Sequence, residues 1–212
     1  MSVNALRWPV GAGFIFVLVV CAPVWALNIQ DGIGAVNHAQ GTTQARNDGS
    51  VRDLKTGGGI LYQDTLVTGD ASRLNVMFAD GSNLFLGDRS ELIIDEMVYE
   101  PKQFGHGVLR LTSGVFRLIS GQINKVPEGE LTIITPQATI GVRGTDFWGH
   151  QTADRLVMAL LDDGELSITT DKGTVVLTDP LSVVTIEKGQ APGAVGKLTK
   201  QQLKDAVATI SW

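Results

Sequence analysis

The residues best suited to chemistry are an arginine between two glycines, in Gly141-Val142-Arg143-Gly144, and the side chains that follow at Asp146 and Trp148. A guanidinium forms charge-assisted, often bidentate hydrogen bonds with carboxylate or phosphate groups. Arg143, Asp146 and Trp148 are therefore the candidate binding residues, for a carboxylate of a protein partner or an anionic group of a ligand. We favour a structural interpretation of Arg143 as an internal anchor, because half-buried arginines are normally paired, here with backbone carbonyls or with a nearby acid such as Asp146. Trp148 then belongs to the core or its rim.

The histidines have no spacing that predicts a metal site. His38, His106 and His150 are far apart in the sequence and match no ligand pattern. The segment Asp80-Gly81-Ser82-Asn83 begins like a calcium loop, but no acidic residue stands at the later ligand position. We expect surface histidines, a hairpin turn at Asp80 and Gly81, and neither a metal ion nor another cofactor.

Two pairs of adjacent carboxylates, Asp95-Glu96 and Asp162-Asp163, are the remaining candidates for catalysis. Neighbouring side chains on a strand point to opposite faces, so neither pair converges as a general acid and base. The sequence contains no Gly-x-Ser-x-Gly nucleophile elbow, no phosphate-binding Walker loop and no dinucleotide fingerprint. We therefore expect a protein that is not an enzyme.

The segment that carries Arg143 has the pattern of a half-buried strand. From residue 137 to residue 143, polar or glycine positions alternate with apolar ones at a period of two. The apolar positions are Ala138, Ile140 and Val142. Pro136 should stand at the first position of the strand or on a sheet edge. Gly141 and Gly144 predict a bulge or a close approach of backbone.

From residue 60 onward, short apolar runs alternate with turns that contain glycine. The expected strands lie within residues 74–78, 84–86, 92–94, 97–99, 108–111, 115–119, 131–134, 156–161, 166–168, 175–177 and 181–186. Ser113-Gly114 is one of the expected separators between strands. This rhythm is typical of an all-β sandwich, roll or solenoid.

The two flanks of this main domain, 55–190, have weaker signals. Residues 27–54 predict one or two short strands within 33–45 and a tight turn at Asn47-Asp48-Gly49, leading into the domain. In 191–212 the period changes to that of a short amphipathic helix, with Thr199 as N-cap and Gln202 three residues on. We favour a helix that lies on the sheet. A helix that binds a membrane surface or a partner is the alternative.

Residues 1–26 have the order of a cleavable secretory signal. Arg7 stands in a start without acids, an apolar stretch follows, and Pro23 precedes small residues and a cut after Ala26. A retained signal anchor over 8–27 and a lipid-modified Cys21 are the alternatives. In each case we expect the remainder of the chain in the periplasm or secreted.

Charge and cysteine content limit the partners and the means of stabilisation. The net charge is −5 at pH 7 without a basic cluster, which argues against nucleic acid and anionic membranes as main partners. The membrane is expected to matter only through the signal sequence, if that is retained. Cys21 is the only cysteine and leaves with the signal, so the core must stabilise the mature domain without a disulfide.

Several pieces of the sequence, in order over about residues 55–170, carry a family resemblance. They are Asp64–Gly69, Ser72-Arg73-Leu74 through Phe78–Ser82, Leu84–Gly87, Leu109–Leu111 through Gly114–Arg117, and Thr135–Phe147. With these pieces the chain resembles a FecR-type domain, named for the periplasmic sensor of the iron–citrate system. The last piece is the most specific of them.

The resemblance implies an extracytoplasmic, non-enzymatic all-β module, built as a twisted solenoid-like or two-layer roll. In the best known members such a domain passes a signal from an outer-membrane receptor to a cytoplasmic sigma factor. Because no anti-sigma segment precedes the apolar stretch and no receptor-binding βαβ unit follows, we expect a stand-alone secreted member. Its expected role is to bind an envelope or secreted protein partner, or to support envelope structure. A periplasmic protein that binds a glycan or small ligand is the alternative.

Overall fold

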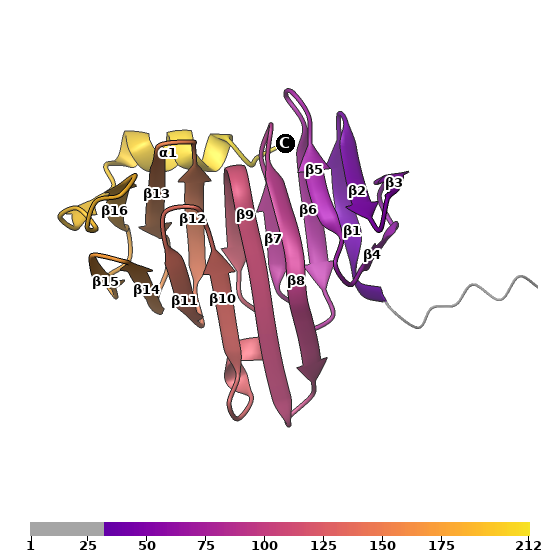
Figure 1. The fold of residues 1–212 in the computed structure, drawn as a ribbon, viewed down its shortest axis with the longest axis horizontal. Helices are drawn as coiled ribbons and strands as arrows, with labels where there is room; N and C mark the ends of the chain where they lie inside the picture. Colours follow the sequence, from indigo (N-terminus) through magenta and orange to yellow (C-terminus); the bar gives the residue numbers. More distant parts are fainter. Residues whose placement is uncertain (1–31) are drawn as a thin grey trace, which may run out of the picture.

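The structure is a computed structural model that describes residues 32–212 (Figure 1). In this part of the chain the strands pair into one continuous sheet that folds into two layers, named sheets A and B here. A single α-helix follows near the C-terminus. The all-β prediction is confirmed, while the predicted signal sequence 1–26 lies outside the described residues.

Sheet A contains, in spatial order, β4 (Gly59–Leu61), β1 (Gly32–Gln40), β6 (Arg73–Phe78), β7 (Asn83–Leu86), the second half of β9 (Phe104–Ile119), β12 (Asp146–Gln151), β13 (Arg155–Leu160), β16 (Ser182–Glu187) and β17 (Gly196–Lys197). Sheet B contains β3 (Ser50–Asp53), β2 (Thr43–Asn47), β5 (Thr65–Thr68), β8 (Glu91–Glu100), the first half of β9, β10 (Glu130–Ile134), β11 (Thr139–Arg143), β14 (Glu165–Thr170) and β15 (Gly173–Leu177). Neighbouring strands are antiparallel, except that β10 runs parallel to β9. The chain visits the two layers in turn as it proceeds, which gives the solenoid-like two-layer roll.

Strand β9 belongs to both layers. Its residues up to Ser113 pair with β8 and β10 in sheet B, and those from Gly114 onward pair with β7 and β12 in sheet A. The prediction that Ser113-Gly114 separates two strands is therefore wrong. The glycine, at φ +96°, lets one strand change layer without a turn.

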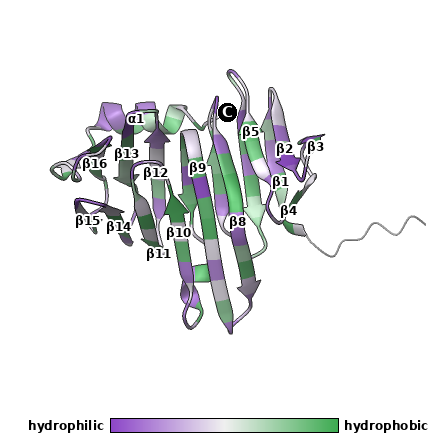
Figure 2. Cartoon of the chain, in the orientation of Figure 1, coloured by the Kyte–Doolittle hydropathy of each residue, from purple (hydrophilic) through white to green (hydrophobic). Residues whose placement is uncertain are grey.

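The core lies between the two sheets and follows the period-two pattern of the sequence. On β11, Ile140 and Val142 are buried while Thr139 and Arg143 are exposed, as the alternation predicted. Figure 2 shows the same alternation of hydrophobic and hydrophilic segments along the strands. Buried side chains of both layers form one cluster, so a single core stabilises sheets A and B together.

Three places where the chain changes layer share one hydrogen-bonding device. At each, a glycine with positive φ is followed by a residue whose N–H donates to a serine hydroxyl. The pairs are Gly41-Thr42 with Ser72 (2.9 Å), Gly114-Val115 with Ser90 (2.9 Å) and Gly144-Thr145 with Ser120 (2.7 Å). We call Ser72, Ser90 and Ser120 the crossing serines. Each satisfies an N–H that the ladder loses where the strand leaves its layer.

Helix α1 (Lys200–Ala208) lies on the outer face of sheet A. Thr199 and Gln202 form the predicted capping box, and Ala206 and Ile210 pack on Val115, Trp148 and Ala159. The indole N–H of Trp148 donates to the hydroxyl of Thr209 at 3.1 Å. This confirms the favoured interpretation of the C-terminal helix. Between Gly32 and Trp212, no helix has the length and apolar content to cross a bilayer.

The layer crossing of β9 gives the first prediction. A Cβ on Gly114 would collide with the hydroxyl and backbone of Ser90, and the positive φ strains any side chain. Gly114→Ala should therefore lower the free energy of unfolding by about 3 kcal/mol or more, measured by urea denaturation. Gly141→Ala is the control, because its Cβ would meet only Ser167, at 3.9 Å. It should be neutral or stabilising by about 0.5 kcal/mol, and equal losses in the two variants would contradict this account.

Candidate functional site

The segment 135–147, on which the sequence placed the candidate site, runs through both layers. Thr135 closes a turn by accepting the N–H of Ala138 on its hydroxyl, and Pro136 lies in this turn, before the strand and not within it. Strand β11 then runs in sheet B, and Gly144, at φ +55°, turns the chain into β12 of sheet A. Gly141 keeps an unbroken register with both neighbouring strands. The predicted bulge or close approach at Gly141 is therefore wrong.

This path separates the three candidate binding residues. Arg143 lies at the end of β11 on the outer face of sheet B, whereas Asp146 and Trp148 lie on β12 in sheet A. The side chain of Arg143 is 82% exposed, and its Nε lies 3.7 Å from a carboxylate oxygen of Glu165 on β14. The interpretation of Arg143 as an internal anchor is thus wrong, because its side chain is exposed and lies beside Glu165 instead of Asp146. The guanidinium of Arg143 is exposed on the surface and can bind a partner or a ligand.

The surface around Arg143 is hollowed, because Gly141 contributes no side chain between its neighbours. The hollow has a volume of about 510 Å³ and is lined by Glu128, Gly129, Glu130, Leu131, Gly141, Val142, Arg143, Glu165 and Ser167. One guanidinium therefore stands among several carboxylates at this point of sheet B. The arrangement offers paired positive and negative groups on an open face.

The partner of Asp146 is Arg117 on β9, which the sequence analysis did not identify. The guanidinium donates from Nε at 2.8 Å and from Nη2 at 2.5 Å to the two carboxylate oxygens. The hydrogen bond with Asp146 raises the pKa of Arg117; burial opposes this and the charge of Asp146 adds to it. The guanidinium also lies 5.9 Å from the ring centre of Phe85. Asp146 is thus occupied by a bidentate ion pair that joins β9 to β12.

Trp148 is covered by the C-terminal helix and is only 8% exposed. Beside Trp148, a groove of about 420 Å³ lies along the contact between α1 and sheet A. His150 and Arg155 line this groove together with Asp205 of the helix. Burial, and then the charge of Arg155, lower the pKa of His150, while Asp88 opposes them. His150 therefore favours its neutral form beneath the helix.

Asp80 and Gly81 form the hairpin turn that the sequence predicted, between β6 and β7. Gly81 takes φ +82°, and Asp80 is buried. The Asp80 carboxylate accepts the N–H of Ser82 at 2.9 Å and the N–H of Ile123 at 3.1 Å. This turn therefore fixes the segment after β9, and its polar groups serve the fold.

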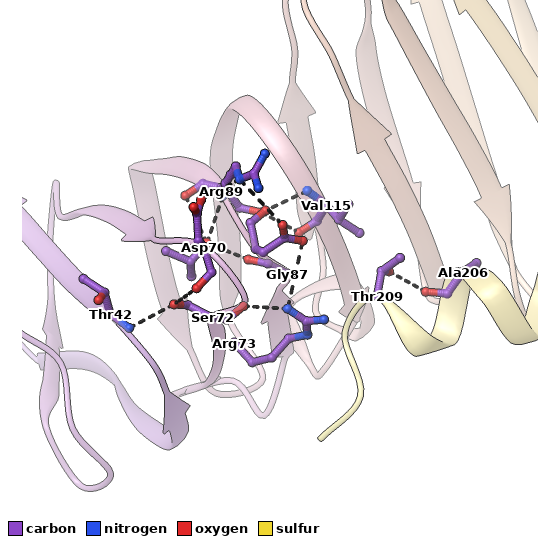
Figure 3. A network of polar contacts seen from close by, with 12 residues as sticks. Thr42, Asp70, Ser72, Arg73, Gly87, Arg89, Val115, Ala206 and Thr209 are labelled. Carbon is purple, nitrogen blue, oxygen red and sulfur yellow. Dashed lines mark hydrogen bonds and ion pairs between the residues drawn. The ribbon is translucent and has the colours of Figure 1, made fainter.

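A tetrapeptide of the pattern Gly-Asp-x-Ser occurs twice in the sequence, at 69–72 and at 87–90. Gly69–Ser72 and Gly87–Ser90 form two neighbouring turns that supply two of the crossing serines (Figure 3). The Nε of Arg89 in the second turn donates to the carboxylate of Asp70 in the first turn at 2.5 Å. The backbone N–H of Arg89 donates to the carbonyl of Gly69 at 3.1 Å. The repetition itself was the signal that could have revealed these linked turns.

Within residues 32–212, no group of three or more His, Cys, Asp or Glu side chains is arranged to hold a metal ion. His106 lies 3.2 Å from Glu96, and the ring of His38 lies edge-on to Trp212 with 4.1 Å between their centres. The three histidines thus lie in three different surroundings.

The comparison with protein families agrees with this fold. The model of the FecR protein family matches residues 64–175, which is more than half of the 212 residues. The chain belongs to the FecR family. The match spans the strands from β5 to β14 and both Gly-Asp-x-Ser turns described above.

Solved structures share the fold at low sequence identity. Two crystal structures of a "putative anti-sigma factor" from Parabacteroides distasonis ATCC 8503 superpose with TM-scores of 0.52 and 0.51, at 13% and 14% identity. The matched part covers 66% of this chain and 62% of the anti-sigma chains, which is less than two thirds of their length. No curated protein matches the FecR-family chain significantly.

The groove under α1 gives a prediction for the dependence of stability on pH. The pKa of His150 is lowered in the folded state, so the unfolded chain binds this proton first as the pH falls below about 6.5. The free energy of unfolding should therefore fall as the pH drops from about 6.5 to the folded pKa, and this loss should be smaller in His150→Gln. Arg155→Gln, which removes the second cause of the shift, should show an intermediate loss. Urea denaturation between pH 7.5 and pH 5 measures the slopes, and identical slopes in all three proteins would exclude this role of His150.

Proposed function

We propose that this FecR-family chain is a non-enzymatic, extracytoplasmic protein-interaction module, which presents the outer face of sheet B to a protein partner in the cell envelope. The observation that carries the proposal is the shape and exposure of this face in a chain of the FecR family. The sequence of the first 26 residues supports export, and the low cysteine content fits a domain stabilised by its core alone.

The outer face of sheet B is wide and continuous. One cross-strand row runs over it from β5 to β15 through registered pairs, in the order Thr65, Ile93, Arg110, Ile134, Thr139, Thr169 and Thr174. These side chains are half-buried or exposed, in contrast to the face of sheet A that lies under α1. A broad surface of mixed threonine, aliphatic and charged groups suits protein recognition better than it suits a small substrate.

The polar groups of the interior support a role without catalysis. Asp64 is fully buried and accepts the N–H of Leu61 at 2.8 Å and a guanidinium N–H of Arg52 at 2.5 Å. Asp80 accepts the N–H of Ser82 in its own turn and the N–H of Ile123 in the segment after β9. These buried carboxylates accept structural hydrogen bonds, so they stabilise the turns in which they stand.

A part in signal transduction is the specific form of this proposal. It rests on the FecR family and on the fold shared with the chains described as an anti-sigma factor. The expected chemistry is reversible binding of an envelope protein, in which the partner's charged groups meet Arg143 and its neighbouring carboxylates.

Binding of a glycan or small ligand is the second candidate, and the hollow at Arg143 favours it. Its volume of about 510 Å³ lies in the usual range of ligand sites, but its walls are charged and open and lack an exposed aromatic ring. An envelope glycan that raises the melting temperature of the wild type, but not that of Arg143→Ala, would favour this candidate over the first.

Photo-crosslinking from the centre of sheet B tests the first candidate. Position 141 lies beside Arg143 in the hollow of sheet B, where an added Cβ meets no atom closer than 3.9 Å, so p-benzoylphenylalanine is placed there. In the native envelope it should cross-link one defined protein. The matched control carries the same group at position 201, on the exposed side of α1, and should not cross-link that protein. The same mixture of abundant proteins from both positions would contradict the proposal.

A further inference from the structure

Strand β15 ends sheet B with an edge that lacks a pairing partner among the described residues. The strand is Gly173-Thr174-Val175-Val176-Leu177, and it pairs with β14 on one side alone. The hairpin loop between them has two residues, Asp171 and Lys172, so Thr170 and Gly173 form the first hydrogen-bonded pair. The alternation of an antiparallel ladder then directs the N–H and C=O groups of Thr174 and Val176 away from β14.

Across residues 32–212, no hydrogen bond reaches these outward main-chain groups from another segment. The strand also lacks the features by which edges usually exclude partners, since it carries no charge, no proline and no bulge. Val176 is 47% exposed. An edge with these properties is a template for one more strand.

The other edges of the two layers differ from β15. Strand β3 carries Arg52 and Asp53, and Arg52 is held by the carboxylate of Asp64. On sheet A, β4 has three residues, while β16 is followed by the two-residue β17. The loop after β16 also donates from the N–H of Gly193 to the carbonyl of Thr185 at 3.0 Å, which occupies part of that edge. Among the edges of the two layers in residues 32–212, β15 thus combines a length of five residues with the absence of charged side chains.

We propose that the edge of β15 binds an extended segment of a partner protein, which adds a strand to sheet B through main-chain hydrogen bonds to Thr174 and Val176. The chemistry of the edge determines this occupant, because unpaired N–H and C=O groups at strand spacing are matched by another extended backbone. On β15, Val175 is partly buried against the main core and Leu177 is buried. The residues of the partner's segment that face inward beside them should therefore be apolar. This inference rests on the proposed function and names the kind of polypeptide that one part of the protein would bind.

The test uses twelve-residue random peptides displayed on phage and selected on the purified protein. The selected peptides should alternate apolar or β-branched residues, lack proline, and protect the amides of Thr174 and Val176 from hydrogen exchange. Val176→Pro removes an outward N–H without breaking a bond to β14, and it should weaken the peptides by about tenfold or more. Val51→Pro is the matched control on the edge of β3, and it should leave the affinity unchanged within about threefold. Val176→Lys is a second variant that keeps the backbone intact and should also weaken binding.

Each other outcome overturns the inference. Peptides that bind Val176→Pro and Val176→Lys as tightly as the wild type, or that protect amides elsewhere, do not use this edge. Sedimentation equilibrium that shows a dimer lost in Val176→Lys would assign the edge to a second copy instead. The edge inference and the proposed function can fail separately. If one defined partner cross-links from position 141 and its cross-linking is unchanged in both Val176 variants, the edge inference is refuted while the proposed function stands.

Discussion

The hydrogen bond from Val115 to Ser90 is the interaction on which the two-layer arrangement depends. Strand β9 crosses from sheet B to sheet A at Gly114, and the crossing leaves an N–H without a ladder partner. The serine hydroxyl accepts this N–H at 2.9 Å and lies so close to Gly114 that a side chain there has no space. Because β9 is central in both sheets, this contact joins the two layers as well as the two ends of the molecule.

The same physical problem recurs at two further places where the chain changes layer, and there the N–H groups of Thr42 and Thr145 donate to the hydroxyls of Ser72 and Ser120. Polar groups of the interior are used to hold crossings and turns, while apolar side chains of both layers fill one core. The outer faces of the two sheets are available for recognition to different extents. Helix α1 covers part of the outer face of sheet A, whereas the outer face of sheet B is exposed in residues 32–212. A protein built in this way presents an open sheet face and an unpaired strand edge, and the proposed protein-binding function rests on these two features.

Much of the fold followed from local patterns, and the errors arose where the outcome depends on which layer a residue enters. Alternation predicted the buried face of β11, and the capping signal predicted α1. The sequence around Gly114 predicts a separator between strands, because a layer crossing and a turn both require a positive φ. Arg143 and Asp146 are close in sequence, yet Gly144 sends them to different sheets, so their true partners depend on strand register, which no local pattern reveals.

The central claim is that β9 joins both layers into one cooperative unit, and native-state hydrogen exchange tests it most directly. Amides of β9 on both sides of Gly114, in 107–113 and in 115–118, should be among the slowest in the protein. They should also open with the same free energy and the same dependence on denaturant. If the two groups instead open with clearly different free energies, the layers unfold separately and β9 does not unite them.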